Sequence, residues 1–584
     1  MPSITGGGLL AAMLAEEGVQ VVFGIIDGTY FGFYSALREH GIALIGPRHE
    51  TSAAHMAGAY ARLTGKLGVC MASNGPGVAN VLPGVAVENG EGNRVLLITS
   101  SRRTGITYPD RGGTFQYFNQ VAVTKPMTKW SGSVPSFERI PEMMRRALRT
   151  SFRGRPGVVH LDVPENIMNG TFKPAALDVR PPSAYRLTRP LPPDPEAVAR
   201  SADLMVGARH PILHIGNGVL AARAWDEVVA VAELLRAPVT TSWAGRSAMV
   251  ETHELSVPMI HVEVNNTVRK DADVVLAVGT RLGETDWWGK PPYWGPAGAQ
   301  KLIQVDIDED VLGVNKALTL GVLADARAYL AALKTELEAR PSTGALGLRN
   351  AKLAEYRAQM VRARADLDKN LTKSAQGVHP SRVASTCRAV FDDDAILVID
   401  GGNTAVWANF YHQVRSPNTI LTTPKMGMLG AGVGQALGAK VALPERQVYC
   451  ILGDGAMGFH PQEVETAVRC GLPVVFLVLC DKQWGMVKMT QQFQMKPVKT
   501  LIMKSLSPEE TINTDFSEIR FDKLAESMGA HGERVSAPAD LEPAIRRAMG
   551  AGRCAVIHID VDPVAHMWAP SLKHFKDMHQ EPGG

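Results

Sequence analysis

Two carboxylates follow neighbouring apolar runs in the last third of the chain. Asp454 lies in the sequence GDGAMG, directly after the run VYCIL, and Asp481 directly follows the run VVFLVLC. Glycines let the backbone approach a ligand closely, and Mg²⁺ takes oxygen ligands and commonly bridges carboxylates to phosphates. The pair therefore predicts a site for Mg²⁺ and a diphosphate group. For an isolated GDG sequence, a simple tight turn would be an equal alternative.

A third acid, Glu50, stands in the sequence GPRHETSAAHMAGAYARLTG, after a predicted strand and at the start of an alanine-rich helix. Its position has a plain alternative explanation, because acids at helix N-termini interact favourably with the helix dipole. Two glycine-containing segments accompany these acids, SNGPGVAN over residues 73–80 and KMGMLGAG over residues 425–432. Both are candidates for close backbone contact with a ligand.

The elements that must position these residues are short β-branched runs that end in Gly or Asp and precede helical stretches. This alternation is typical of parallel sheets with βα crossovers. The runs form three groups, divided by the proline-rich segment RPLPPDPEA and by a polar stretch over residues 341–376. We predict an α/β fold of three doubly wound parallel-sheet domains over residues 1–185, 190–340 and 375–584, with ligands at the carboxyl ends of the strands.

The GDG sequence and the later acid resemble the thiamine diphosphate motif of the superfamily that contains acetohydroxyacid synthase, pyruvate decarboxylase and 2-hydroxyacyl-CoA lyase, and the resemblance extends over the whole chain. It implies that Asp454, Asp481 and the Gln483 carbonyl bind Mg²⁺. Where the family usually has Asn-Asn, this chain has Cys480-Asp481, which adds negative charge. The cofactor-binding residues that the resemblance implies in this diphosphate-binding domain are Gly402, Asn403, Thr404, Gly427, Met428, Leu429, Gly453, Asp454, Gly455, Ala456, Asp481, Gln483, Trp484, Gly485 and Met486.

The same resemblance makes the first domain the pyrimidine-binding domain. Glu50 matches the acid that hydrogen-bonds the aminopyrimidine ring, so that the ring amine can take the proton from the thiazolium carbon. That role requires Glu50 to be shielded from water in an apolar pocket. Pro76 and Asn80 match the loop against this ring, and Gln116 matches a catalytic residue of the active loop. Leu429 matches the side chain that bends the cofactor, and the Gly427 carbonyl would accept from the ring amine. In this family the glutamate of one subunit meets the diphosphate-binding domain of another, so the resemblance implies a homodimer or homotetramer with active sites at the subunit interface.

The reaction is less constrained by these motifs. Decarboxylases of the family carry a His-His pair in the active loop, where residues 111–120 of this chain contain no histidine. They also carry a glutamate after the metal-binding loop, where this chain has Val487. The flavin-binding segments of acetohydroxyacid synthase correspond to residues 259–262 and 279–284, which lack the expected pattern, so FAD is disfavoured. The overall pattern resembles actinobacterial 2-hydroxyacyl-CoA lyases. We therefore predict a thiamine diphosphate- and Mg²⁺-dependent lyase and carboligase that reversibly cleaves a 2-hydroxyacyl-CoA to an aldehyde or ketone and formyl-CoA.

Two alternatives stay open. One is an acetolactate synthase-like carboligase or decarboxylase that acts on 2-oxo acids, and the other, disfavoured because Glu50 and both metal acids are present, is a non-catalytic subunit. The central Rossmann-like domain either holds an ADP moiety near residues 216–218 or holds no nucleotide.

Composition excludes several other classes of protein. The 61 Lys and Arg residues against 58 Asp and Glu residues give a net charge of +3, too balanced for a chain that coats nucleic acid or an anionic membrane. A basic leader and a long apolar run are not apparent, so a cytoplasmic protein is expected. The six scattered cysteines are expected to be reduced, mostly buried residues rather than a disulfide framework or zinc site.

Overall fold

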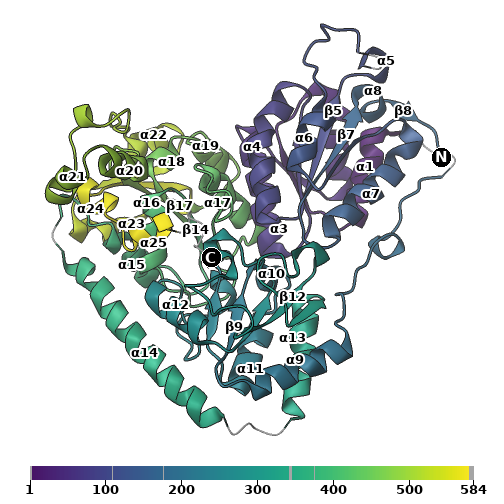
Figure 1. The fold of residues 1–584 in the computed structure, drawn as a ribbon. Helices are drawn as coiled ribbons and strands as arrows, with labels where there is room; N and C mark the ends of the chain where they lie inside the picture. The colour runs from purple at the N-terminus through teal and green to yellow at the C-terminus, as the bar shows by residue number, and fades with distance from the viewer. Residues whose placement is uncertain (1–2, 108–109, 175, 341–344, 374, 578–584) are drawn as a thin grey trace.

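A computed structural model describes residues 3–107, 110–174, 176–340, 345–373 and 375–577. Three parallel β-sheets, each with a buried apolar cluster on both faces, dominate the fold (Figure 1). The predicted architecture of three doubly wound α/β units is therefore confirmed. Within the described ranges, no helix has the length and apolar character needed to cross a membrane. All six cysteines are free, and five of them are buried.

The first sheet has the strand order β3-β2-β4-β5-β7-β6. Alternate side chains of β4 face opposite clusters, with Val69 and Met71 on one side and Cys70 and Ala72 on the other, so both faces of the sheet are covered. The strands are β2 (Val21–Gly24), β3 (Ala43–Ile45), β4 (Gly68–Ala72), β5 (Val95–Ser101), β6 (Trp130–Ser133) and β7 (Val158–Pro164). Two long helices on one face are α3 (Glu50–Thr64) and α4 (Pro76–Glu91).

The third sheet repeats this topology, with the order β15-β14-β16-β17-β19-β18. Its strands are β14 (Ile396–Ile399), β15 (Ile420–Leu421), β16 (Val448–Gly453), β17 (Val474–Cys480), β18 (His531–Val535) and β19 (Ala555–Asp560). All of these strands are parallel, but the chain adds β15 on one side of β14 and β16 on the other, so the strand order reverses between β14 and β16. Open parallel sheets bind ligands beyond the carboxyl ends of the strands at such a switch point. Helices α16 (Asn403–Tyr411) and α18 (Asp454–Met457) begin at these two strand ends.

The central sheet has the order β10-β9-β11-β12-β13. Its strands are β9 (Pro211–Ile215), β10 (Val239–Thr241), β11 (Val274–Val278), β12 (Lys301–Asp306) and β13 (Leu320–Leu323). The long helix α14 (Leu346–Asp368) then runs along the outside of the molecule toward the third sheet (Figure 1). This placement accounts for its polar sequence, since only Arg349, Leu353 and Tyr356 are buried.

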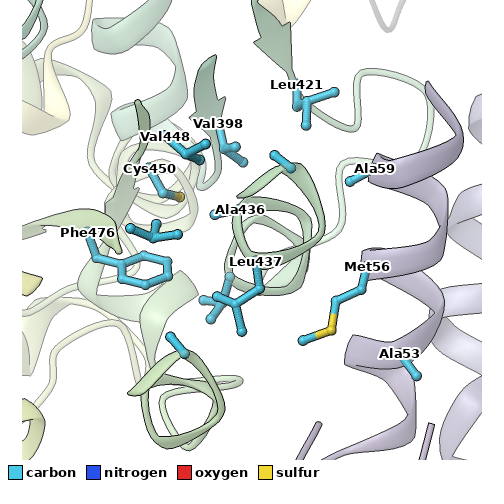
Figure 2. Packing of buried hydrophobic residues seen from close by; sticks show 14 of the residues in the cluster. Ala53, Met56, Ala59, Val398, Leu421, Ala436, Leu437, Val448, Cys450 and Phe476 are labelled. Carbon is cyan, nitrogen blue, oxygen red and sulfur yellow. The ribbon is translucent and has the colours of Figure 1, made fainter. Parts of the chain in front are cut away.

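The first and third units share one apolar core. Helix α3 and its topological equivalent α17 (Ala431–Ala442) pack side by side, and Figure 2 shows Met56 and Ala59 of α3 facing Ala436 and Leu437 of α17. A Cβ atom on Gly438 would stand 2.4 Å from the Met56 carbonyl oxygen, so a glycine is needed for this close approach. The packing fixes the two units relative to each other.

We expect Gly438→Ala to lower the melting temperature by several degrees. The added methyl would overpack the α3–α17 contact, which costs about 1–3 kcal/mol, and each kcal/mol shifts the melting temperature by about 2–4 °C in a domain of this size. Differential scanning fluorimetry would measure the change. The matched control is Gly347→Ala in α14, where a Cβ meets no atom within 4 Å. Equal melting temperatures for both variants would contradict the packing argument.

Candidate functional site

The candidate diphosphate-binding residues surround the N-termini of α16 and α18. A Cβ on Gly453 would stand 3.0 Å from the Thr404 hydroxyl oxygen, and a Cβ on Gly402 would stand 3.4 Å from the Met486 Cβ. The glycines therefore allow close packing where the N-termini of the two helices meet, and helix N-termini bind phosphate through their free N–H groups. Asn403 is buried, and its Oδ1 has no hydrogen-bond partner among the described residues.

The two metal-candidate acids lie together at the ends of β16 and β17. Asp454 accepts hydrogen bonds from the Gly455 and Lys482 backbone N–H groups, both at 2.7 Å. Burial raises the pKa of Asp454, and the nearby negative charge of Asp481 raises it further. Two adjacent carboxylates, half-buried Asp454 and buried Asp481, form a donor set that fits a hard divalent cation.

The segment after β17 closes this site from one side. A Cβ on Gly485 would stand 2.8 Å from Asn403 Nδ2 and 3.3 Å from Asp481 Oδ2, so this glycine lets the two side chains converge. The Gln483 side chain donates to Asp481 Oδ2 at 3.2 Å and to the Pro563 carbonyl at 2.9 Å. The Trp484 ring covers Gly455. The structure thus brings together the predicted residues 402–404, 453–456 and 481–486.

A histidine that the sequence did not single out completes this cluster. His566 belongs to the short helix α24 (Pro563–Met567) and is only 4% exposed. Its Nδ1 lies 2.6 Å from Asp481 Oδ2, and its Nε2 lies 3.0 Å from the Thr404 hydroxyl oxygen. No motif marks this position, because the contact joins residues that are far apart in the chain.

The residues predicted for the pyrimidine side gather at the carboxyl edge of the first sheet. Asn80 Nδ2 donates to the Glu50 carboxylate at 3.1 Å, and Asn74 Nδ2 donates to the Gln116 carbonyl at 3.0 Å. Gly75 and Gln116 both have positive φ angles and pack so closely that a Cβ on Gly75 would stand 2.7 Å from the Gln116 carbonyl oxygen. The loop before α4, through Asn74, and the first turns of α4, through Asn80, therefore connect Gln116 with Glu50.

In one chain, this side of the site is open. Glu50 is half-buried rather than enclosed by apolar side chains, Pro76, Asn80 and Gln116 are exposed, and Phe115 is 73% exposed. The apolar pocket expected around Glu50 is therefore not formed by its own chain. Across the described ranges, no hydrogen bond joins Glu50 or Gln116 to residues 427–429.

Residues 427–429 follow a backbone segment that a first-domain carboxylate holds. Glu91 Oε1 accepts from the Lys425 and Met426 N–H groups at 2.9 and 3.1 Å. Glu91 ends α4, about 16 Å along the helix from Asn80. Gly427 has a φ of +59°, and Leu429 packs against the shared core. The predicted cofactor-bending loop therefore depends on the first domain for its position.

Burial raises the pKa of Glu91 to about 7. The folded protein therefore binds this proton more tightly than the unfolded chain, and this contribution to stability is full below pH 4.5 and is lost as the pH rises through 7. We expect Glu91→Gln to match wild type near pH 4.5 and to gain up to about 3 kcal/mol relative to it by pH 8, at 1.36 kcal/mol per pKa unit. Thermal melts across this range would measure it, with exposed Glu338→Gln as control. Parallel curves for Glu91→Gln and wild type would contradict the prediction.

A cavity and a second group of possible metal ligands lie in the same domain as the acidic pair. A cavity of about 550 Å³ beside Asp454 is walled by Phe459, Trp484 and Phe516. Farther along the sheet edge, Glu518, His558 and Asp560 form a group with metal-ligand spacing. Arg534 already bridges Glu518 and Asp560 with contacts of 2.8 and 2.9 Å, so an ion-pair network accounts for this group.

The central domain's glycine turn is explained by packing. A Cβ on Gly216 would stand 2.2 Å from the Gly279 carbonyl oxygen, and the Gly218 N–H donates to the same carbonyl at 3.0 Å. These glycines are required where the β9 turn touches the β11 turn, whether or not a nucleotide binds.

Three family models match the chain in order. They describe the N-terminal thiamine pyrophosphate-binding domain over residues 4–123, the central domain of thiamine pyrophosphate enzymes over residues 198–333 and the C-terminal thiamine pyrophosphate-binding domain over residues 400–559.

Curated relatives match over nearly the full chain. A probable acetolactate synthase large subunit of Methanococcus aeolicus is 27% identical, covering 96% of this chain and 92% of the relative. The acetolactate synthase isozyme 3 large subunit of Escherichia coli K12 is 27% identical, with coverage of 98% and 97%. The sulfoacetaldehyde acetyltransferase of Castellaniella defragrans is 30% identical, with coverage of 92% and 89%. These matches do not support the narrower resemblance to 2-hydroxyacyl-CoA lyase. With its three parallel-sheet domains and these full-length relatives, the chain belongs to the thiamine pyrophosphate enzyme family, in its acetolactate synthase-like part.

Proposed function

We propose that the protein is a thiamine diphosphate- and Mg²⁺-dependent carboligase that joins the acyl unit of a 2-oxo acid to a second carbonyl compound. The observation that carries this proposal is the full-length similarity to relatives named acetolactate synthase and sulfoacetaldehyde acetyltransferase, two names that both refer to an acetyl group. In such a reaction the bond between the carboxylate carbon and the keto carbon of the 2-oxo acid breaks, and CO₂ leaves. The keto carbon forms a new bond to the carbonyl carbon of the acceptor, and one proton is taken up.

The residues of the site support a carboligase over a simple decarboxylase. When bound, thiamine diphosphate supplies the nucleophilic carbon that takes up the acyl unit. Releasing an aldehyde would then require a protein acid to protonate that unit. Half-exposed Val487 stands where decarboxylases carry their glutamate, and residues 111–120 contain no histidine. A carbonyl acceptor is therefore the more suitable partner for the acyl unit.

Each predicted residue has a defined task in this proposal. Asp454, Asp481 and the Gln483 carbonyl would hold Mg²⁺, and the N-termini of α16 and α18 would bind the diphosphate. Glu50 would hold a proton on the pyrimidine ring, Leu429 would support the bent cofactor, and Gln116 would orient the acceptor carbonyl. The acidic pair and the unpartnered Asn403 oxygen are consistent with these tasks. The CoA-dependent lyase reaction stays a prediction, and the proposal includes neither ADP nor FAD.

Acceptor-dependent CO₂ release tests the reaction. Purified protein with thiamine diphosphate and Mg²⁺ would receive pyruvate alone, and then pyruvate with a second 2-oxo acid or with an aldehyde. The proposal predicts one CO₂ for each new carbon–carbon bond, with no free acetaldehyde. Stoichiometric acetaldehyde, or no consumption of any 2-oxo acid, would contradict it.

We further propose that two copies of the chain complete each site. Support comes from the open pyrimidine side, and from exposed apolar residues on the other half, Met486 and Val487 together with Val498 and Ile502 of α21 (Pro497–Met503). A mixture of Glu50→Gln and Asp454→Asn chains separates shared from internal sites. Shared sites predict that equal mixing restores about a quarter of wild-type activity, because half of the dimers are mixed and each has one intact site. Sites within one chain would restore none.

A further inference from the structure

His566 connects the two halves of the candidate cofactor site in the third domain. Its imidazole lies between Asp481, which follows β17, and Thr404, in the first turn of α16, at 2.6 and 3.0 Å. The first of these residues is a metal candidate, and the second is a diphosphate candidate. A single buried side chain therefore spans the cation side and the phosphate side.

The hydrogen-bond roles follow from the chemistry of the partners. An ionised carboxylate can only accept, so Nδ1 must donate to Asp481. In a singly protonated imidazole, Nε2 is then an acceptor for the Thr404 hydroxyl. Asp481 Oδ2 also accepts from the Gln483 amide at 3.2 Å, so this oxygen has two donors. The other oxygen, Oδ1, is the one left for a metal ion.

The surroundings hold His566 rigidly. Asp562 caps α24 by accepting from the Val564 and Ala565 N–H groups, and the His566 carbonyl accepts from the Trp407 indole at 2.9 Å. The His566 N–H donates to the Asp562 carbonyl at 2.8 Å. A histidine whose two ring nitrogens and whose backbone are all hydrogen-bonded is held in place, and it can therefore fix the rotamer of the carboxylate that it contacts.

The aspartate itself gives a reason for this arrangement. Asp481 is only 7% exposed, and its carboxylate lies close enough to Asp454 to raise the pKa of that residue. A buried charge without partners is costly, so an additional donor is needed. His566 supplies that donor from the C-terminal segment.

We propose that His566 is a positioning residue that aims Asp481 at the metal ion and Thr404 at the diphosphate group, an inference that rests on the proposed cofactor site. The loss of an outer partner of a metal ligand typically lowers metal affinity by about 10–100-fold. The same loss is expected to weaken Mg²⁺ binding in His566→Phe.

Titration of Mg²⁺ at fixed thiamine diphosphate, followed by quenching of tryptophan fluorescence, would measure the binding constants without using activity. We expect His566→Phe to weaken Mg²⁺ binding about 10–100-fold in the Asp481 background and by a much smaller factor in the Asp481→Asn background. The matched control is His412→Phe, which removes another buried histidine of the same domain, bonded to Tyr449 at 3.3 Å. It should leave Mg²⁺ binding unchanged.

The outcomes separate the two proposals. If wild type binds neither Mg²⁺ nor thiamine diphosphate, the proposed function is wrong. If wild type binds both, two results would show that only the positioning role is wrong. In the first, the Mg²⁺ affinity of His566→Phe is within twofold of wild type. In the second, His566→Phe weakens Mg²⁺ binding by the same factor in the Asp481 and Asp481→Asn backgrounds. Should His566→Phe fail to fold by circular dichroism, His566→Gln replaces it in the same comparison, with the same two criteria.

Discussion

Glu50→Gln is expected to lower the turnover rate about 10²–10⁴-fold, the range over which a positioned proton-transfer group contributes. The amide keeps the size of the side chain and can still accept from Asn80, so the local structure of α3 should be retained. Because the metal candidates lie in the third domain, the binding of Mg²⁺ should change less than about threefold. Steady-state kinetics and calorimetric titration would measure the two quantities.

The matched control is Glu39→Gln, an exposed glutamate of the same domain. It should leave both turnover and cofactor binding unchanged. A Glu50→Gln variant with more than half of the wild-type turnover would show that Glu50 is only a helix-start acid.

Asp454→Asn is expected to have opposite effects on binding and on stability. Removing one of the two carboxylates should weaken Mg²⁺ binding by at least about 100-fold, more than the loss of an outer partner costs. Without added metal, burial and Asp481 raise the pKa of Asp454, so the neutral amide relieves an unfavourable charge. The melting temperature of the metal-free variant should therefore equal or exceed that of wild type, while the rise on adding Mg²⁺ and thiamine diphosphate disappears.

Asp392→Asn is the control for this variant. It removes an exposed carboxylate just before β14, at the amino ends of the strands, whereas Asp454 lies at their carboxyl ends. It should show the full cofactor-induced rise in melting temperature. If Asp454→Asn shows that rise as well, Asp454 is not a metal ligand.

The sequence predicted the fold class and the positions of the site segments because both follow from local patterns. Apolar runs that end in Gly or Asp predicted the strand ends, and the structure places Asp454 and Asp481 at two such neighbouring ends. The predicted boundaries of the three domains stay a prediction. The roles of the individual site residues likewise await the binding and kinetic measurements.

Contacts between distant segments were beyond local patterns. His566 and Glu91 hold site residues through hydrogen bonds across 85 and 334 positions of sequence, and neither lies in a recognisable motif. The glycines near Gly216 illustrate the opposite problem, since a pattern typical of nucleotide binding also arises where two backbone turns touch. Sequence alone could not distinguish these two causes.

The reaction itself depends on which substrate reaches the site, and product analysis by mass spectrometry tests this most directly. Purified protein, thiamine diphosphate and Mg²⁺ would be given ¹³C-labelled pyruvate in one series and short 2-hydroxyacyl-CoA thioesters in another. The proposed carboligase predicts a labelled hydroxy-oxo acid such as acetolactate in the first series and intact thioesters in the second. Formyl-CoA with an aldehyde or ketone from the thioesters, and pyruvate left untouched, would contradict it and establish the lyase reaction instead.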